Sequence, residues 1–422
     1  MIDRKFKTDT MFMYGSQLGS MGSSFLFSLL VTRYAGVEVF GELTLLIALA
    51  GFLSNLLTFR TNEAVIAFYK RGEVNGDHGL CKLSLFAGVA LDTLVGLLLM
   101  LILAIFADVV AGELLHNPET VGAIKLYALM VLVQLVTSTP VAYLMAKGRF
   151  KLVWTMSLAA NGGKLAVAGL FILAGSAMSL ESSVMSMLFP AAVIYLSAYG
   201  YLLWLALVGL RKVRVCRSGG MIREYISFSV STFMSSTLKA GNQNIDSLVL
   251  GYLAGTHTVG LYGLFRQFLG ALPFLSSPFT ALVYPKFVEA VAGHKISLVR
   301  KSIGLVNRRL IVAYVIVSML IIVCLTAYLW WIREGLHLGE KVSFLLLLTA
   351  AIVNGLLWWS RPFSNSVNPD ISLRANLYAS GFLLISLYPS IQFSGMMGAA
   401  SCMLLLALML YVYWTKVMRN YV

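Results

Sequence analysis

The sequence predicts an all-α polytopic membrane protein with about twelve transmembrane helices. Hydrophobic residues make up 59% of the 422 residues, charged residues only 12%, and the mean hydropathy is +0.83. Soluble domains carry about 25% charged residues. A bilayer core about 30 Å thick takes about 20 apolar residues per helix, and twelve segments meet this requirement. They are residues 10–32, 43–68, 83–107, 121–146, 152–175, 184–208, 225–253, 259–287, 305–331, 342–359, 371–389 and 396–415.

The first and eleventh segments need separate justification. The first begins with basic residues, but its apolar run is long and has no small-residue cleavage pattern, so we expect a membrane span rather than a removed signal peptide. The eleventh carries Arg374 and Asn376 near its start, and we expect Pro389 to close it. It could therefore be partly re-entrant.

The distribution of Lys and Arg predicts the orientation. Basic residues gather near both termini and after the even-numbered segments, whereas the loops after the fifth, seventh and eleventh segments contain none. Basic loops stay on the cytoplasmic side, so both termini are expected in the cytoplasm. The net charge of +14 then follows from topology and from attraction to anionic membrane lipids, and no nucleic-acid partner is needed to explain it.

A weak internal repeat predicts two lobes. Ala35-Gly36 and Ala254-Gly255 are each followed by four residues and a glycine, and Pro140 and Pro362 lie near the ends of the fourth and tenth segments. Six spans on each side of such a repeat favour two parallel six-helix lobes. We expect an N-terminal lobe at 1–210, a basic cytoplasmic linker at 211–220 and a C-terminal lobe at 221–422.

The motifs of hydrolytic and metal chemistry are missing from the sequence. It contains no GxxxxGK[ST] phosphate loop and no HExxH pair. Its four cysteines are scattered and form no CxxC. The sequence therefore predicts a carrier that is not an enzyme, needs no cofactor and holds no metal.

Six ionisable side chains lie inside the predicted spans: Arg60, Glu63, Lys164, Lys239, Asp246 and Arg266. A charge near the bilayer centre costs about 2.5 to 3.5 kcal/mol, so such residues usually face a watery cavity or one another. Four of the six are cationic. An excess of positive charge inside the membrane indicates an anionic cargo, and phosphate is the commonest group of that kind.

Two helix faces extend this polar set. Lys239, Asn242, Gln243 and Asp246 fall at i, i+3, i+4 and i+7, which is one face of the seventh span. Gln17 begins a stripe on the first span that continues through Ser20, Ser24 and Ser28. We expect the amides Gln17, Asn242 and Gln243 to bind sugar hydroxyls, and the cations Lys239, Arg266 and Arg60 to bind phosphate.

Each of these residues also has a structural explanation. Arg60 and Glu63 could form an ion pair at i, i+3, and Asp246 and Arg266 could pair between the seventh and eighth spans. Glu63 and Asp246 are also candidates for proton coupling.

Lys164, with Asn161 at i−3, could serve bonding within its lobe, and the serine stripe could equally well be close packing. The tryptophans near the span ends are expected to be interfacial anchors; they are Trp330, Trp331, Trp358, Trp359 and Trp414.

Two passages resemble a known family. The run from Gln17 to Gly22, followed by Thr32-Arg-Tyr-Ala-Gly-Val-Glu-Val-Phe-Gly-Glu-Leu, and the run Asn242-Gln-Asn-Ile-Asp-Ser-Leu-Val-Leu-Gly-Tyr-Leu-Ala-Gly resemble the polysaccharide-export branch of the multidrug/oligosaccharidyl-lipid/polysaccharide (MOP) superfamily. That resemblance implies two MATE-like lobes around a central cavity. It also implies a Wzx-type O-antigen flippase of the bacterial inner membrane, which moves undecaprenyl-diphosphate-linked oligosaccharide by alternating access, with other polysaccharide-assembly proteins as further partners.

Two other functions remain open at this point. A cation-coupled multidrug exporter shares the superfamily plan, although an acidic cavity would suit cationic drugs better than the basic set found here. A membrane-embedded polysaccharide polymerase or acyltransferase would need a large external loop or a His/Asp pair, and the histidines are isolated.

Overall fold

The computed structural model describes residues 4–57, 61–175, 177–204, 244–276, 296–367 and 370–420. Helices make up almost all of these residues, and none of them lies in a strand. Backbone groups in a bilayer must be hydrogen-bonded internally, which is why apolar segments of this length become helices. The chain divides into two compact units, residues Met1–Ala240 and Gly241–Val422. The predicted linker at 211–220 lies outside the described residues and stays a prediction.

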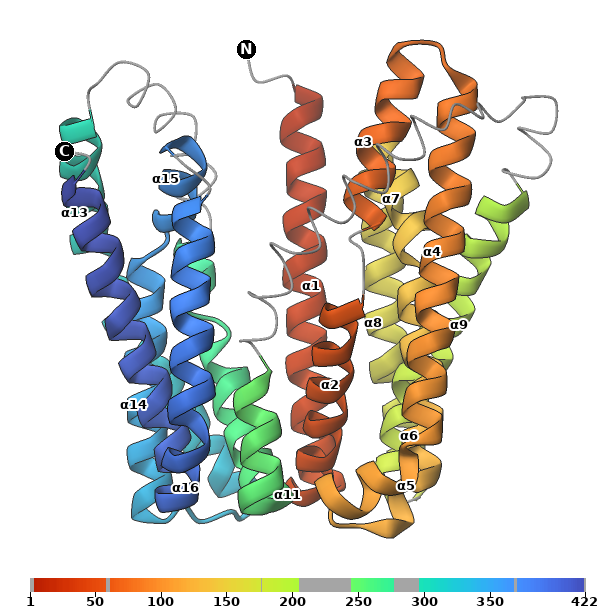
Figure 1. Ribbon diagram of the computed structural model, residues 1–422. Coiled ribbons are helices and arrows are strands. Elements are labelled where there is room, and N and C mark those ends of the chain that lie inside the picture. The colour runs from red at the N-terminus through yellow and green to blue at the C-terminus, as the bar shows by residue number, and fades with distance from the viewer. Residues whose placement is uncertain are drawn as a thin grey trace. The chain divides into compact units, whose positions relative to one another are not determined.

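The first unit is a bundle in which long helices are joined by short turns (Figure 1). Helix α1 packs against α8, α4 packs against α3 and α6, and α9 packs against α6 and α8. Helix α7 packs against α3. The elements in order are α1 (Arg4–Tyr34), α2 (Val37–Leu57), α3 (Thr61–Val74), α4 (His78–Ile105), α5 (Ala107–Val109), η1 (Val110–Leu114), η2 (Pro118–Thr120), α6 (Val121–Val136), α7 (Ser138–Ala146), α8 (Phe150–Leu173) and α9 (Leu180–Trp204).

The second unit is also helical. Helix α16 packs along α14 and α11, and α13 packs against α14 and α11. Its described elements are α11 (Ile245–Leu269), α13 (Ile296–Ile332), α14 (Leu338–Leu356), α15 (Ser360–Val367) and α16 (Asp370–Asn420).

Nine helical segments of the described part are long and apolar enough to cross a membrane. Several boundaries differ from the predicted ones. The predicted second span, 43–68, begins earlier and is described as two helices, α2 and α3.

The prediction that Pro389 closes the eleventh span is wrong. Helix α16 continues through Pro389 and turns at Ser394 and Gly395, where the φ angles are −142° and 54°. The eleventh segment is thus a full-length helix.

Positive φ angles recur at matching turns of the two units. Gly36, between α1 and α2, has φ 96°, and Gly255, inside α11, has φ 81°. These are the two glycines of the Ala-Gly repeat, and only glycine adopts this conformation without steric cost. The same correspondence holds for Gly175 (φ 70°) with Gly395 (φ 54°), and for His116 (φ 53°) with Arg333 (φ 61°). The backbone therefore shows the internal repeat that the sequence indicates.

The two matched prolines interrupt matched spans. Pro140 is the third residue of α7, which follows α6 after a break at Thr137, and Pro362 is the third residue of α15, which follows α14 after a turn. Proline has no N–H, and its ring clashes with the carbonyl four residues earlier. The long helix therefore ends a few residues before each proline, and a short helix begins two residues before the proline and contains it.

Three of the five tryptophans expected at the membrane interface lie in the core of the second unit. Trp359 is 2% exposed, and Trp358 and Trp414 are also buried, whereas Trp330 is 84% exposed and Trp331 is exposed as well. The Trp359 ring makes edge contacts with Phe363 and Trp414, and Trp358 donates its Nε1–H to Asn307 Oδ1 at 2.8 Å. The anchor prediction is therefore wrong for these three, because sequence position near a span end does not specify which way a ring faces.

Candidate functional site

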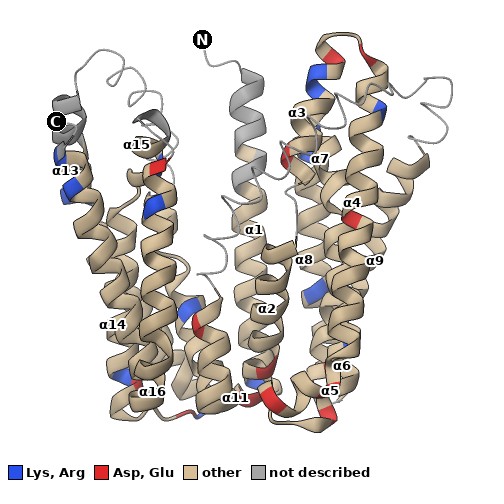
Figure 2. Ribbon diagram, in the orientation of Figure 1, with Lys and Arg blue, Asp and Glu red and all other residues tan. Residues whose placement is uncertain are grey.

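Four of the predicted site residues, Arg60, Lys239, Asn242 and Gln243, lie outside the described residues, and their roles stay predictions. The other six fall in four places. Asp246 and Arg266 are in the second unit; Asn161 and Lys164 are on α8 of the first unit; Gln17 is on α1, and Glu63 is on α3. Figure 2 shows that charges gather near the helix ends and that few lie in the middle of a helix.

Asp246 and Arg266 meet within α11. The Gly255 turn folds the two parts of this helix back on each other, so residues 20 positions apart become neighbours. Arg266 Nη1 donates to Asp246 Oδ1 at 3.0 Å and to Oδ2 at 3.2 Å. It also donates to Ser247 Oγ at 3.0 Å.

Two further donors satisfy the carboxylate. Tyr262 donates its hydroxyl to Asp246 Oδ2 at 2.7 Å, and the Ser247 N–H donates to Oδ1 at 2.8 Å. Asp246 is fully buried, whereas 37% of the Arg266 side chain is exposed. The carboxylate therefore fixes one edge of the guanidinium, and the arginine side chain as a whole is partly exposed. Such an arrangement can hold a cation ready for an anion without leaving its own charge uncompensated.

A polar seam joins α1 and α8 in the first unit. Lys164 Nζ donates to Ser24 Oγ at 3.1 Å, and Asn161 Nδ2 donates to Ser20 Oγ at 3.3 Å and to the Ser157 carbonyl at 2.9 Å. The two helices also approach closely at Gly15 of α1. A Cβ at this position would lie only 3.2 Å from the Trp154 ring of α8. Ser20 and Ser24 thus serve helix packing, the structural alternative for the serine stripe.

Lys164 is a buried cation, 8% exposed, in the middle of α8. Its ammonium group lies 5.1 Å from the centre of the Phe27 ring. Within the described ranges it has no acidic partner, and one serine hydroxyl uses only one of its three donors. The lysine therefore keeps capacity to bind an anion that reaches the seam.

Gln17 and Glu63 are both exposed. Gln17 lies on α1, one turn before Ser20. Glu63 lies in the first turn of α3, where its backbone N–H donates to Asn62 Oδ1 at 2.8 Å. Whether Glu63 pairs with Arg60 is a prediction that concerns a residue outside the described ranges.

Sequence reasoning missed Asp92, which lies near the middle of α4 and is 6% exposed. Its Oδ2 accepts from Thr139 Oγ1 at 2.6 Å and from the Thr139 N–H at 2.9 Å, and its Oδ1 accepts from Thr61 Oγ1. The available signal was a lone carboxylate among leucines in the third predicted span. The mean hydropathy of that span is high enough that a single acidic residue barely lowers it.

Metal binding finds no support in the described ranges, which contain no group of three or more His, Cys, Asp and Glu side chains able to hold an ion. At the end of α3, Lys147 and Lys70 donate to Glu73 at 2.9 and 2.7 Å. These two hydrogen bonds lower the pKa of the Glu73 carboxyl to about 2, and the bond from Lys147 has the larger effect.

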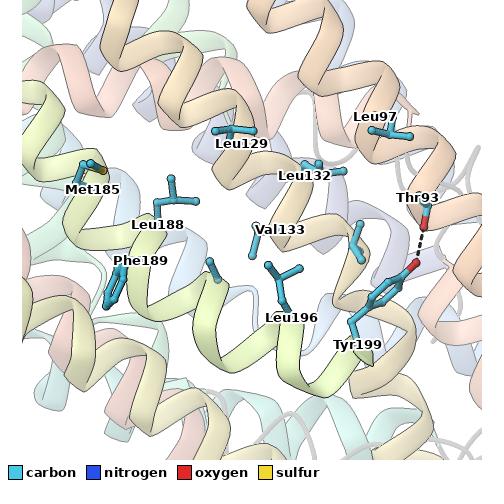
Figure 3. A pocket seen from close by; sticks show the side chains of 12 residues that line it. Thr93, Leu97, Leu129, Leu132, Val133, Met185, Leu188, Phe189, Leu196 and Tyr199 are labelled. Atoms are coloured by element: carbon cyan, nitrogen blue, oxygen red, sulfur yellow. Dashed lines mark hydrogen bonds between the residues drawn. The ribbon is translucent and has the colours of Figure 1, made fainter. Parts of the chain in front are cut away.

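The first unit contains an apolar groove of about 540 Å³ between α4, α6 and α9 (Figure 3). Leu97, Leu132 and Phe189 line it, and its polar feature is a contact of 3.0 Å between the Thr93 and Tyr199 hydroxyls. The groove suits a hydrocarbon chain and offers no charge to a phosphate.

Comparisons with known proteins agree on family and fold. Residues 6–291, more than half of the chain, match the sequence profile described as polysaccharide biosynthesis protein. None of the curated proteins compared with the chain matches it significantly.

Solved structures give the fold at low sequence identity. An inward-facing multidrug resistance MATE family transporter of the MOP superfamily aligns with a TM-score of 0.74 and 11% identity, covering 96% of this chain and 95% of that one. Lipid II flippase MurJ in an inward closed conformation aligns with a TM-score of 0.69 and 13% identity, covering 97% and 87%. A MATE structure in complex with MaL6 aligns with a TM-score of 0.62 and 9% identity, covering 98% and 96%. These matches confirm the predicted fold class, an all-α, multi-pass membrane protein of MATE-like architecture.

Proposed function

The chain belongs to the polysaccharide biosynthesis protein family, and from this premise we propose that it is a flippase for lipid-linked oligosaccharide. Its substrate would be an undecaprenyl-diphosphate-linked repeat unit of O-antigen or a similar surface polysaccharide. The family match carries this proposal, and the MATE and MurJ fold supports it. In this function both termini lie in the cytoplasm, the membrane is the bacterial inner membrane, and other polysaccharide-assembly proteins deliver and receive the substrate.

Charge is the property of such a substrate that a membrane protein must compensate. The diphosphate carries about two negative charges into a region where an isolated charge is costly. We propose that Lys239, Arg60 and Arg266 supply a cationic cavity. The partial exposure of the Arg266 side chain, whose guanidinium is held by Asp246, supports its part in this. Lys164 is a further candidate cation, because it is buried without an acid partner in the described part of the chain.

The oligosaccharide requires hydrogen-bonding groups rather than charge. Gln17, Asn242 and Gln243 would bind sugar hydroxyls, and Gln17 is exposed on α1. Alternating access then carries the head group across while the isoprenoid tail stays in lipid. Outward movement of negative charge across a membrane negative inside is favourable by about 2.3 kcal/mol per charge per 100 mV, so the membrane potential would bias the direction.

The experiment is complementation of cells that lack their own flippase, with surface glycan display as the readout. Lys239→Gln and Arg266→Gln should each reduce display at equal protein level. The matched control is Lys341→Gln, which removes an exposed cation from α14 and should leave display unchanged. Full display in both cavity variants would refute the cationic cavity, and failure of the wild-type chain to restore any surface glycan would refute the flippase function.

A cation-coupled multidrug exporter is the second candidate, because the aligned MATE structure is described as a multidrug resistance transporter. Dye efflux from the same cells distinguishes the two functions. We expect no efflux of cationic dyes above background, and efflux without glycan display would favour the exporter instead.

A further inference from the structure

The structure contains a buried carboxylate that the proposed function does not use. Asp92 lies near the middle of the 28-residue helix α4 and is 6% exposed. Its three donors are the Thr61 hydroxyl, the Thr139 hydroxyl and the Thr139 N–H. Over the described ranges, no cation hydrogen-bonds or pairs with it. Within these ranges, hydroxyl and amide groups are therefore the partners of this acid.

The chemistry of these donors allows both protonation states. A threonine hydroxyl can donate to an ionised carboxylate, and it can equally accept the proton of a neutral carboxylic acid. An ammonium or guanidinium partner could only donate, and would hold the acid ionised. Burial disfavours the ionised form, whereas the three donors and the N-terminal end of α7 favour it. The two effects oppose each other at the same group.

The surrounding helices carry other titratable groups, and none of those described bonds to Asp92. Glu42 on α2 accepts from Asn117, and Tyr199 on α9 contacts Thr93. Glu63 on α3 is exposed, and the Lys70–Glu73–Lys147 cluster is more than two helical turns along α3 from Thr61. The remaining buried groups on the neighbouring helices are Tyr69 on α3, Tyr127 on α6 and Tyr143 on α7.

The role of Asp92 is more than capping the break before Pro140. The Thr139 N–H becomes available because Pro140 interrupts the helix, and Asp92 accepts from it. The second unit forms the matching break before Pro362, and α13, which takes the place of α4 there, contains no Asp or Glu. The break therefore forms without a buried acid, and the charge on α4 needs a separate reason.

We propose that Asp92 is a proton-binding site within the first unit. Its ionised form accepts from Thr61 on α3 and Thr139 on α7, and so ties both helices to α4. Uptake of a proton from water adds the O–H bond at one carboxyl oxygen. The carboxyl then donates where it previously accepted, which weakens the tie to α3 and α7. Release of the proton restores it. In the flippase, and resting on that proposed function, this change would couple proton movement to rearrangement of the lobe.

Infrared spectroscopy tests the site without any transport. The difference spectrum of the full chain in lipid between about pH 5 and about pH 8 should contain the C=O stretch of a buried protonated carboxyl. Asp92→Asn should remove this band, since the amide does not titrate. Asp108→Asn, at an exposed acid of α5, is the matched control and should retain it. A band that persists in Asp92→Asn, or wild-type protein without such a band, overturns the proton site.

Threonine variants test the geometry if Asp92→Asn fails to fold. Thr139→Val removes one donor to the ionised form, so the midpoint of the same band should move up by about half to one pH unit. Thr137→Val is the matched control, because Thr137 Oγ1 donates to the Gln134 carbonyl and not to Asp92. An equal shift in both variants, or in neither, would contradict the proposed site.

The coupling role is tested separately. Glycan transport should depend on pH in the wild type and not in Asp92→Asn, and an unchanged pH profile would overturn coupling alone.

Discussion

The ion pair of Asp246 and Arg266 allows structural and transport roles to be separated. Arg266→Gln leaves a fully buried carboxylate with the Tyr262 hydroxyl and the Ser247 N–H as its remaining donors. Breaking a buried pair from one side costs about 3 to 5 kcal/mol. Because 37% of the Arg266 side chain is exposed, water already weakens the pair. We therefore expect a loss near the lower end, about 3 kcal/mol.

The reciprocal variant should cost less. Asp246→Asn leaves a guanidinium that can still reach water, and the new amide can accept from Tyr262, so we expect a loss of about 1 to 2 kcal/mol. The double variant contains no unpaired charge and should lose no more than about 1.5 kcal/mol. The double-mutant cycle then gives a coupling energy of at least about 2.5 kcal/mol.

The assay is equilibrium unfolding in mixed micelles of mild detergent and SDS, followed by circular dichroism. Additive losses in the double variant would refute the pair as a stabilising unit. Glycan display by the same variants then isolates function. A double variant that is stable but does not restore display shows that the pair has a role beyond stability, whereas full display would show that the arginine serves only Asp246.

Three further predictions test packing and electrostatics. Gly355→Ala should destabilise the second unit by about 1 to 3 kcal/mol, because the added Cβ would clash with the Tyr314 hydroxyl. Gly381→Ala, whose Cβ would meet nothing within 4 Å, is its control in the same unfolding assay. Trp359→Ala should lose about 3 to 5 kcal/mol and Trp330→Ala no more than about 0.5 kcal/mol; equal losses would contradict the burial of Trp359. The stability difference between wild type and Glu73→Gln should be constant above about pH 4.5, the ordinary value for the carboxyl, and should disappear as the pH falls toward about 2. The measurement is the thermal midpoint of unfolding of both proteins across this pH range. A difference between the two midpoints that does not change with pH would show that Lys147 and Lys70 do not stabilise the ionised carboxyl.

Local pattern predicted some three-dimensional features well. The Ala-Gly repeat predicted two matched halves, and its glycines, Gly36 and Gly255, both have positive φ angles, a conformation that favours glycine. Pro140 and Pro362 likewise mark matched breaks. Asp246 and Arg266 were candidates for a pair, but their common contact with Ser247 and Tyr262 depends on the way in which α11 folds back at Gly255.

Other features depend on which helix faces which, and sequence periodicity does not give this. Lys164 and Asn161 on α8 meet Ser24 and Ser20 on α1, which lie 140 and 141 positions earlier in the sequence. Asp92 gains its donors from two other helices. Trp359 and Trp414 are buried against each other although both lie near the ends of spans.

The amino-acid sequence alone determined that this protein is a helical, multi-pass membrane protein with a repeated half, because the bilayer demands about 20 apolar residues per span and internally bonded backbone. Those demands act on one segment at a time and can be read locally. The tertiary structure decided how each buried charge is satisfied. A carboxylate in the membrane is stabilised only by donors close to it in space, and for Asp92 these come from Thr61 and Thr139 on two other helices.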